Sequence, residues 1–139
     1  MPLTAADENA IKLLARSDVQ MTMIGLKKFI GDSRWVSKSN FYAMNVIRKL
    51  DQHPPRTPSN NRDLSQYIAA SAILHANDGW GYLGRAISCL MVGDAHRALH
   101  LAYYAELRAG MALLAGEGVG IFNFKHYLIN SPDSTKKIE

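Results

Sequence analysis

The chain has 139 residues, of which 47% are hydrophobic, and a formal net charge of +4. This length fits one domain, and this hydrophobic content is sufficient for a core. One cysteine excludes an internal disulfide framework, and no apolar stretch reaches the length of a membrane span. The N-terminal residues lack the basic and apolar regions of a secretory signal, so the sequence predicts a cytoplasmic protein without a membrane partner.

The basic residues are concentrated in the first part of the chain. Residues 1–62 carry ten Lys and Arg against five Asp and Glu, whereas residues 63–139 carry six against seven. An excess of positive charge favours an acidic partner such as a nucleic acid, although an ordinary solvated surface explains the same count. The charge distribution therefore leaves both interpretations open.

Two helices are predicted before the proline-rich part of the chain. Thr4 followed by Asp7 is a capping box that begins the first helix, and a break falls at residues 31–33, Gly-Asp-Ser. A second helix begins at Ser39 or Asn40. Its apolar residues recur at the spacing of one helical face: Phe41, Met44, Ile47 and Leu50.

The proline-rich stretch, residues 52–63, is predicted to be a loop. A third helix follows from Asp63 to about Ala76, and the Asn-Asp-Gly sequence at residues 77–79 predicts a turn. The apolar face of a fourth helix then follows in the sequence: Trp80, Leu83, Ile87 and Leu90.

The longest predicted helix covers residues 94–115, with Asp94 as its N-cap and Gly116 at its end. Its apolar residues cover much of its circumference, so we expect this helix to be central to the domain. Small residues at alternating steps of four and three let a second helix approach closely, within the domain, across a homodimer or against a partner protein. These residues are Ala98, Ala102, Ala105, Ala109 and Ala112.

The glycine-rich segment 116–120 follows a helix C-terminus, where the helix dipole disfavours anions, so it predicts a C-cap and turn and not a phosphate loop. Residues 121–129 predict a short strand or hairpin, and the polar segment 131–139 predicts a flexible tail. The predicted fold is all-α, a bundle of about five helices around residues 94–115 in one domain, residues 1–130. A lone strand near the end also indicates that the chain is the front part of a longer protein.

The segment GDAHRALHLAYYAELRAGMALLAGEGV, residues 93–119, resembles the signature helix of HEPN domains, the higher eukaryote and prokaryote nucleotide-binding family. The resemblance is carried by the Gly-Asp turn, the Ala-Tyr-Tyr-Ala motif at 102–105, the Leu-Leu pair and Gly118. It implies an all-α bundle, commonly dimeric, tied to RNA, nucleotides, and toxin–antitoxin or phage-defence systems. Some members are metal-independent ribonucleases with an Arg-x(4–6)-His motif, which Arg48 and His53 match as the candidate catalytic pair.

Polar side chains four residues apart form a ridge along the long helix, from His96 through His100 and Tyr104 to Arg108. The two histidines have the spacing of a metal-chelating pair, but a catalytic zinc site usually has a third protein ligand, so we expect no metal or other cofactor. The candidates for contacts with phosphates or a base are Arg97, His100, Tyr104 and Arg108. Alternatively, the tyrosines pack in the core.

Residues 27–62 hold eight Lys and Arg against two Asp and Glu, interleaved with aromatic residues. Basic side chains release counterions from phosphates, and exposed aromatic rings stack on unpaired bases. The alternative is that the aromatic residues are core residues and that the basic side chains are solvated. The candidate nucleic-acid-binding residues are Lys27, Lys28, Arg34, Trp35 and Lys38.

Three functions follow from these patterns. The first is a non-catalytic helical module that forms a homodimer or binds a partner through the alanine stripe, within a toxin–antitoxin or phage-defence assembly. The second is a HEPN-type endoribonuclease that uses Arg48 and His53. The third is a nucleic-acid-binding module that acts through residues 27–62. The sequence favours the first, because it contains no convincing catalytic constellation.

Overall fold

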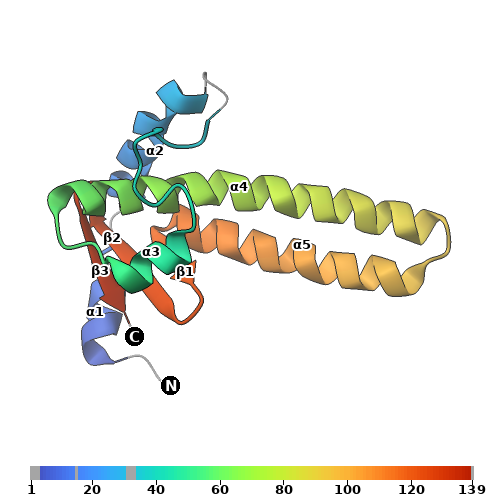
Figure 1. The fold of residues 1–139 in the computed structure, drawn as a ribbon. Helices are drawn as coiled ribbons and strands as arrows, with labels where there is room; N and C mark the ends of the chain where they lie inside the picture. Colours follow the sequence, from blue (N-terminus) through green and yellow to red (C-terminus); the bar gives the residue numbers. More distant parts are fainter. Residues whose placement is uncertain (1–3, 15, 31–33, 139) are drawn as a thin grey trace.

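The computed structural model describes residues 4–14, 16–30 and 34–138 (Figure 1). In these residues the chain forms five helices and a three-stranded antiparallel sheet, so the fold is mainly helical with a small β-sheet near the C-terminus. None of the described helices is long and apolar enough to cross a membrane. The elements are α1 (Ala5–Lys12), α2 (Arg16–Ile30), α3 (Val46–Gln52), α4 (Pro58–Met91), α5 (Ala95–Gly116), β1 (Val119–Phe122), β2 (Lys125–Ser131) and β3 (Ser134–Ile138).

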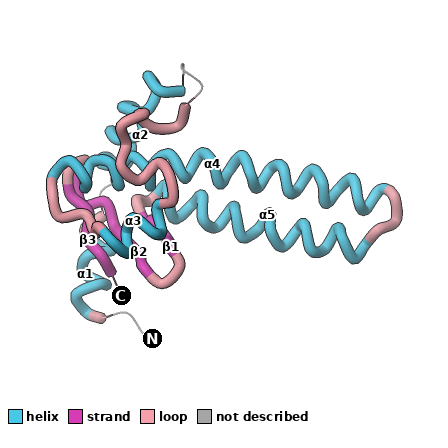
Figure 2. The backbone as a smooth tube through the Cα atoms, in the orientation of Figure 1, coloured by secondary structure: helices cyan, strands magenta, loops and turns pink. Residues whose placement is uncertain are grey.

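The two longest helices, α4 and α5, form an antiparallel hairpin that projects from the rest of the molecule (Figures 1 and 2). At 1.5 Å per residue, α4 is roughly 50 Å long and α5 is roughly 33 Å long. Asp94 caps α5 as predicted, and Gly93 makes the preceding turn at φ 81°. The loop predicted at residues 52–63 is wrong in its second half, because the N-cap Thr57 and Pro58 in the first turn begin α4 there.

Helix α4 is continuous through residues 77–79, so the turn predicted at the Asn-Asp-Gly sequence is wrong. Gly79 instead faces α5, where a Cβ would lie 3.5 Å from the carbonyl oxygen of Ala105. Asp78 pairs with Arg108 of α5, with 3.8 Å between Oδ2 and Nε. The contacts of Asp78 and Gly79 with α5 stabilise the continuous helix more than the local preference of Asn-Asp-Gly favours a turn.

The strands form one sheet in the order β1-β2-β3, with antiparallel pairing throughout. Gly118, at φ 87°, connects α5 to β1, so the glycine-rich segment is the predicted C-cap and turn. Gly120 pairs with Tyr127 and lies against α4, where a Cβ would be 2.6 Å from Cγ1 of Ile68. The predicted strand or hairpin is therefore present, and Asn123 at φ 52° lies in the turn between β1 and β2.

Strand β3 lies within residues 131–139, so the prediction of a flexible tail there is wrong. The polar side chains of this segment bond to the first turns of α4. Asn61 Oδ1 accepts hydrogen bonds from the backbone nitrogen of Thr135 at 2.9 Å and from its hydroxyl at 2.6 Å. Arg62 Nε pairs with Asp133 Oδ1 at 2.6 Å. Contacts with a helix about 70 residues earlier order a segment whose own composition predicts disorder.

The core lies where the sheet packs between α4 and α1. Tyr127 and Ile129 of β2 pack with Ile68 of α4, and all three side chains are buried. Leu128, between them in the strand, points to the opposite face of the sheet and packs with Ala10 of α1. Both faces of β2 are thus covered, which fixes the register of the sheet against the helices.

The segment before α4 packs around Tyr42, whose side chain is fully buried. Its hydroxyl donates a hydrogen bond to the carbonyl oxygen of His53 at 3.0 Å. Helix α3 begins after the N-cap Asn45, later than the predicted start at Ser39 or Asn40. Asn40 does not cap a helix, because its side-chain oxygen accepts from the backbone nitrogen of Tyr42 at 2.9 Å and holds a turn.

The N-terminal helices α1 and α2 lie on either side of this core (Figure 1). Thr4 caps α1 as predicted, because its hydroxyl oxygen accepts from the backbone nitrogen of Asp7 at 3.2 Å. Helix α2 packs on α4 through Leu26, which contacts Ala69. The break predicted at residues 31–33 lies outside the described residues.

Candidate interaction surface

Helix α5 is predicted to be central, yet Ala98 and Ala115 are its only buried residues in the described chain. It packs along α4 and, at its C-terminal end, against β1 (Figure 1). Much of its apolar circumference therefore faces outward. The predicted bundle around α5 is not confirmed within one chain, and the helix has apolar surface available for a partner.

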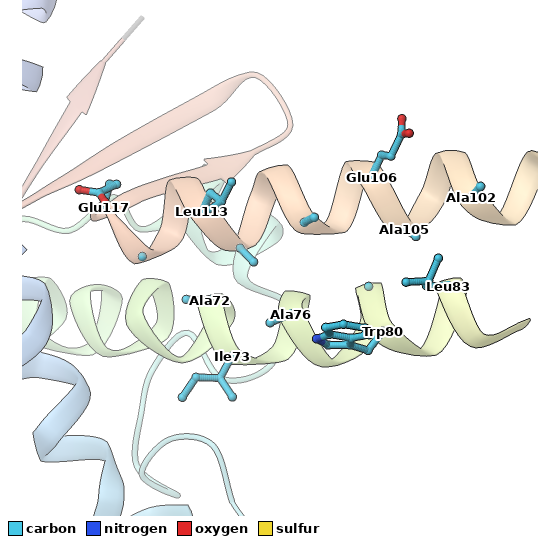
Figure 3. Close-up of a pocket in the computed structure, with 14 residues that line it drawn as sticks. Ala72, Ile73, Ala76, Trp80, Leu83, Ala102, Ala105, Glu106, Leu113 and Glu117 are labelled. Atoms are coloured by element: carbon cyan, nitrogen blue, oxygen red, sulfur yellow. The ribbon is translucent and has the colours of Figure 1, made fainter. Parts of the chain in front are cut away.

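One face of the hairpin is hollowed into a groove of about 850 Å³ between α4 and α5 (Figure 3). Larger apolar side chains stand at its sides, above all Trp80 and Leu113, which are 74% and 73% exposed. Residues with small side chains line its middle and keep the helix backbones close: Ala72, Ala76 and Gly79 from α4, and Ala102, Ala105, Ala109 and Ala112 from α5. We call this surface the groove face.

The groove face carries little charge. Its ionisable side chains are Glu106 and Glu117. Glu117 forms an ion pair with Arg16 of α2, and Glu106 points outward from α5 in Figure 3. The remaining side chains of the lining are apolar, apart from an indole nitrogen on Trp80. A surface of this kind is typical of the centre of a protein–protein interface.

Exposed apolar side chains continue along the hairpin to its outer end. Met91 and Val92, beside the turn, are 82% and 81% exposed. Monomeric proteins rarely expose large apolar patches without a binding role, so the exposed apolar side chains mark this end of the hairpin as a candidate for contacts with a partner. The other exposed large side chains on this half of the hairpin include Ile87, Leu90, Leu99, Tyr103, Tyr104 and Leu107.

The opposite side of the hairpin holds a cluster of aromatic and basic side chains. The ring of Tyr104 stacks on Tyr82 of α4, with 5.5 Å between centroids, and meets His100 edge to face at 4.9 Å. Arg85 lies over the Tyr82 ring at 4.7 Å. Tyr82 and Tyr104 therefore pack on each other across the hairpin and are partly exposed. Arg97, another of the predicted contact residues, pairs with Asp94 at 3.6 Å.

Arg108 is separated from that cluster and belongs to a second pocket, of about 700 Å³, at the base of the hairpin. Its Nη1 lies 2.9 Å from Nδ1 of His75, and its Nε lies 3.8 Å from Oδ2 of Asp78. Burial, followed by the charge of Arg108, lowers the pKa of His75 below its ordinary value, while Asp78 acts in the opposite direction. The pocket lining shares no residue with the groove face.

The candidate catalytic pair lies on and beside α3. Arg48 is exposed on the helix, and His53 follows its last residue. The His53 ring contacts Phe41 edge to face, with 5.8 Å between centroids. No hydrogen bond joins Arg48 to His53 in the described part of the chain. The structure therefore gives this pair no supporting polar contact.

The basic residues of the nucleic-acid hypothesis lie apart from the hairpin groove. Lys27 is exposed on α2, and the side chain of Lys28 lies outside the described residues. Arg34, Trp35 and Lys38 line a separate pocket of about 340 Å³, in which the indole of Trp35 is 40% exposed. The structure thus brings together three of the five predicted residues.

The alanine stripe is divided between two roles. Ala98 is buried inside the hairpin, so it is unavailable to a partner, whereas Ala102, Ala105 and Ala109 line the groove. The sequence placed Trp80 on the apolar face of a helix without showing what that face meets, and it did not single out His75. Periodicity shows which side chains share a face, but it does not reveal whether that face meets the same chain or another.

Comparison with protein-family models, with curated proteins and with solved structures finds no match to this chain. The resemblance to HEPN domains therefore has no support beyond the residues of α5 that carry it. Among the described residues, no group of three His, Cys, Asp or Glu side chains is placed to hold a metal ion.

Proposed function

We propose that this chain is an interaction module that forms a homodimer through the groove face of its hairpin. The observation that carries the proposal is an exposed Trp80 beside a groove lined with alanines, a projecting side chain next to a hollow on the same surface. In a two-fold dimer each surface meets its own copy, so each Trp80 enters the groove of the other chain. Two hairpins packed in this way form a four-helix bundle around the α5 helices, as the sequence predicts for a central helix.

The apolar area of the hairpin supports an interface of ordinary size. Full burial of a Val, Leu, Ile, Phe or Met side chain contributes about 1.5–3 kcal/mol, at about 25 cal/mol per Å² of apolar surface. Each such side chain therefore removes roughly 60–120 Å² of apolar surface from water. A standard interface buries about 800 Å² per partner, which about ten such side chains supply. The contributors would be Ile73, Trp80, Leu83, Ile87, Leu90, Met91, Leu99, Tyr103, Leu113 and the groove alanines.

The mass of the protein in solution tests the proposal. We expect light scattering at micromolar concentration to give twice the 15.4 kDa of one chain. Ala109→Glu places a carboxylate inside the apolar groove and should give a folded monomer. Asn77→Glu adds the same charge on the exposed outer side of α4 and should leave the dimer intact. A monomeric wild-type protein, or a dimer that tolerates Ala109→Glu, would contradict the proposal.

An assay for RNA cleavage separates this module from the ribonuclease hypothesis. We expect neither the wild-type protein nor His53→Ala to cleave RNA in the absence of metal. Cleavage that disappears in a folded His53→Ala variant would make the chain a ribonuclease with Arg48 and His53 in the catalytic site. Steeply salt-dependent RNA binding, lost when Arg34 and Lys38 are replaced, would instead support the nucleic-acid hypothesis. The toxin–antitoxin and phage-defence roles stay predictions of the family resemblance.

A further inference from the structure

The pocket at the base of the hairpin is enclosed by three parts of the fold. Helices α4 and α5 form one side, the first residues of α3 another, and β1 with the following turn the third. Its volume of about 700 Å³ falls within the range of small-molecule sites, about 300–1,000 Å³. A pocket of this size, with apolar walls and a few polar groups gathered together, is a candidate ligand site.

The guanidinium of Arg108 is the main polar group of this pocket. Its side chain is 32% exposed, so about two thirds of it is removed from water. A guanidinium has five N–H donors, yet in the described chain the Arg108 side chain makes one hydrogen bond, with His75. The nearest carboxylate oxygen, on Asp78, lies 3.8 Å from Nε, beyond hydrogen-bond distance. Arg108 therefore retains donors for an oxyanion.

The contact with His75 holds the guanidinium of Arg108 and fixes the protonation of the imidazole. Arginine only donates hydrogen bonds, so Nδ1 of His75 must accept the bond from Arg108 at 2.9 Å. The imidazole is then neutral and carries its proton on Nε2, on the side of the ring that points away from Arg108. Contact with an anion is therefore left to the guanidinium, whose remaining N–H groups form a fork that matches the planar oxygen pair of a carboxylate.

The charge balance selects the kind of anion. Arg108 contributes one positive charge, neutral His75 contributes none, and half-exposed Asp78 contributes one negative charge at the edge of the site. A dianion would meet repulsion from Asp78 without a second cation to compensate for it. A monoanion is better matched, because the partly buried guanidinium faces it directly while the Asp78 carboxylate is partly solvated.

We propose that this pocket binds a small monocarboxylic acid with an apolar body, its carboxylate on the guanidinium of Arg108 and its body toward the apolar wall. The wall extends from the polar groups toward the sheet and offers both aliphatic and aromatic contacts. Its larger side chains include Val46, Ile47, Leu74, Met111, Ile121 and Phe122. The site lies outside the groove face, so it does not depend on the proposed dimer.

Phenylacetate is a suitable probe, because it joins a carboxylate to an aromatic ring small enough for the pocket. Titrated into the protein and followed by NMR, it should give saturable shifts of the His75 ring and Arg108 side-chain signals. Phenylacetamide has nearly the same shape without the charge, and we expect it to bind at least tenfold more weakly. Phenyl phosphate, which carries two negative charges at neutral pH, should also bind more weakly than phenylacetate.

Variants at two arginines of the same helix provide the control. Arg108→Gln should weaken phenylacetate binding at least tenfold, whereas Arg97→Gln, whose side chain is exposed and outside the pocket, should leave it unchanged. If Arg108→Gln does not fold, the comparison of phenylacetate with phenylacetamide on the wild-type protein still decides. The proposal is wrong if phenylacetate gives no saturable shift, if phenylacetamide or phenyl phosphate binds equally well, or if both variants behave alike. These results test the ligand site alone, because the proposed dimer is tested separately by the mass of the protein in solution.

Discussion

Gly79 of α4 faces the carbonyl oxygen of Ala105 on α5, and a Cβ at this glycine would lie 3.5 Å from that oxygen. The same Cβ would lie 3.5 Å from Cβ of Arg108. Both separations are ordinary van der Waals contacts, so the position has room for a methyl group but not for a longer side chain. The close approach of the two helices thus sets a limit on side-chain size in the middle of the hairpin.

The first prediction concerns this limit. Gly79→Ala should stabilise the protein by up to about 1 kcal/mol, because alanine has the higher helix propensity and its methyl group fits. Gly79→Leu should destabilise it by roughly 1–3 kcal/mol, since the longer side chain forces the helices apart. Urea unfolding of both variants measures the two free energies. A destabilised Gly79→Ala would mean that the helices pack more closely than described.

Gly120 in β1 gives a contrasting prediction. A Cβ at this position would lie 2.6 Å from Cγ1 of Ile68, which is a steric clash with a fully buried side chain. Gly120→Ala should therefore cost roughly 1–3 kcal/mol of the free energy of unfolding. Its cost should fall in an Ile68→Ala background, where Cγ1 and Cδ1 of Ile68 are absent and only Cε2 of Phe122, at 2.8 Å, still crowds the new Cβ, so a double-mutant cycle should report a coupling. Equal costs in the two backgrounds would show that Ile68 is not the obstacle.

Local signals in the sequence predicted much of the helical structure. The caps at Thr4 and Asp94 are confirmed, as are the long helix α5 and the glycine-rich turn after it. These features depend on residues within one helical turn of each other, which is the range that sequence patterns report. The errors at residues 77–79 and in strand β3 involve contacts with distant residues, which local patterns do not contain.

The candidate surface was predictable in part for the same reason. Small residues at helical spacing correctly placed Ala102, Ala105 and Ala109 on one surface of α5. Trp80 was placed on the apolar face of a helix, but its exposure was not predicted, because an exposed apolar face has the same periodicity as a buried one. The pairing of Arg108 with His75 joins residues 33 positions apart, and it depends on the continuity of α4 that the sequence did not reveal.

Tyr42 leads to a prediction at alkaline pH. Burial, with smaller effects of Tyr127 and Asp63, raises its pKa from 10.0 to about 12. The folded protein therefore keeps the phenol proton at a pH where the unfolded chain has lost it, so stability should fall as pH rises from about 10 toward 12. Tyr42→Phe should lose about 1–2 kcal/mol at pH 7, because the carbonyl of His53 loses its donor. The variant should also lose stability less steeply above pH 10, measured by urea unfolding. An unchanged alkaline slope would contradict the burial of this hydroxyl.

His75 leads to a prediction at acidic pH. Its pKa lies below the ordinary 6.5 because of burial and then Arg108, with Asp78 opposing them. Between the folded pKa and 6.5 the unfolded chain binds more protons than the folded protein, so stability should fall as pH decreases below 6.5. Protonation would also remove the acceptor that Arg108 uses and place two cations side by side.

Urea unfolding between pH 7.5 and pH 4.5 measures this effect, with NMR titration of the His75 ring on the same protein. His75→Gln retains an acceptor for Arg108 but does not titrate, so its stability should depend less on pH in this range. His96→Gln removes an exposed histidine near the start of α5 and should leave the wild-type dependence in place. If His75 titrates at or above 6.5, or if the two variants lose the same pH dependence, the claim that a neutral His75 accepts a hydrogen bond from Arg108 is wrong.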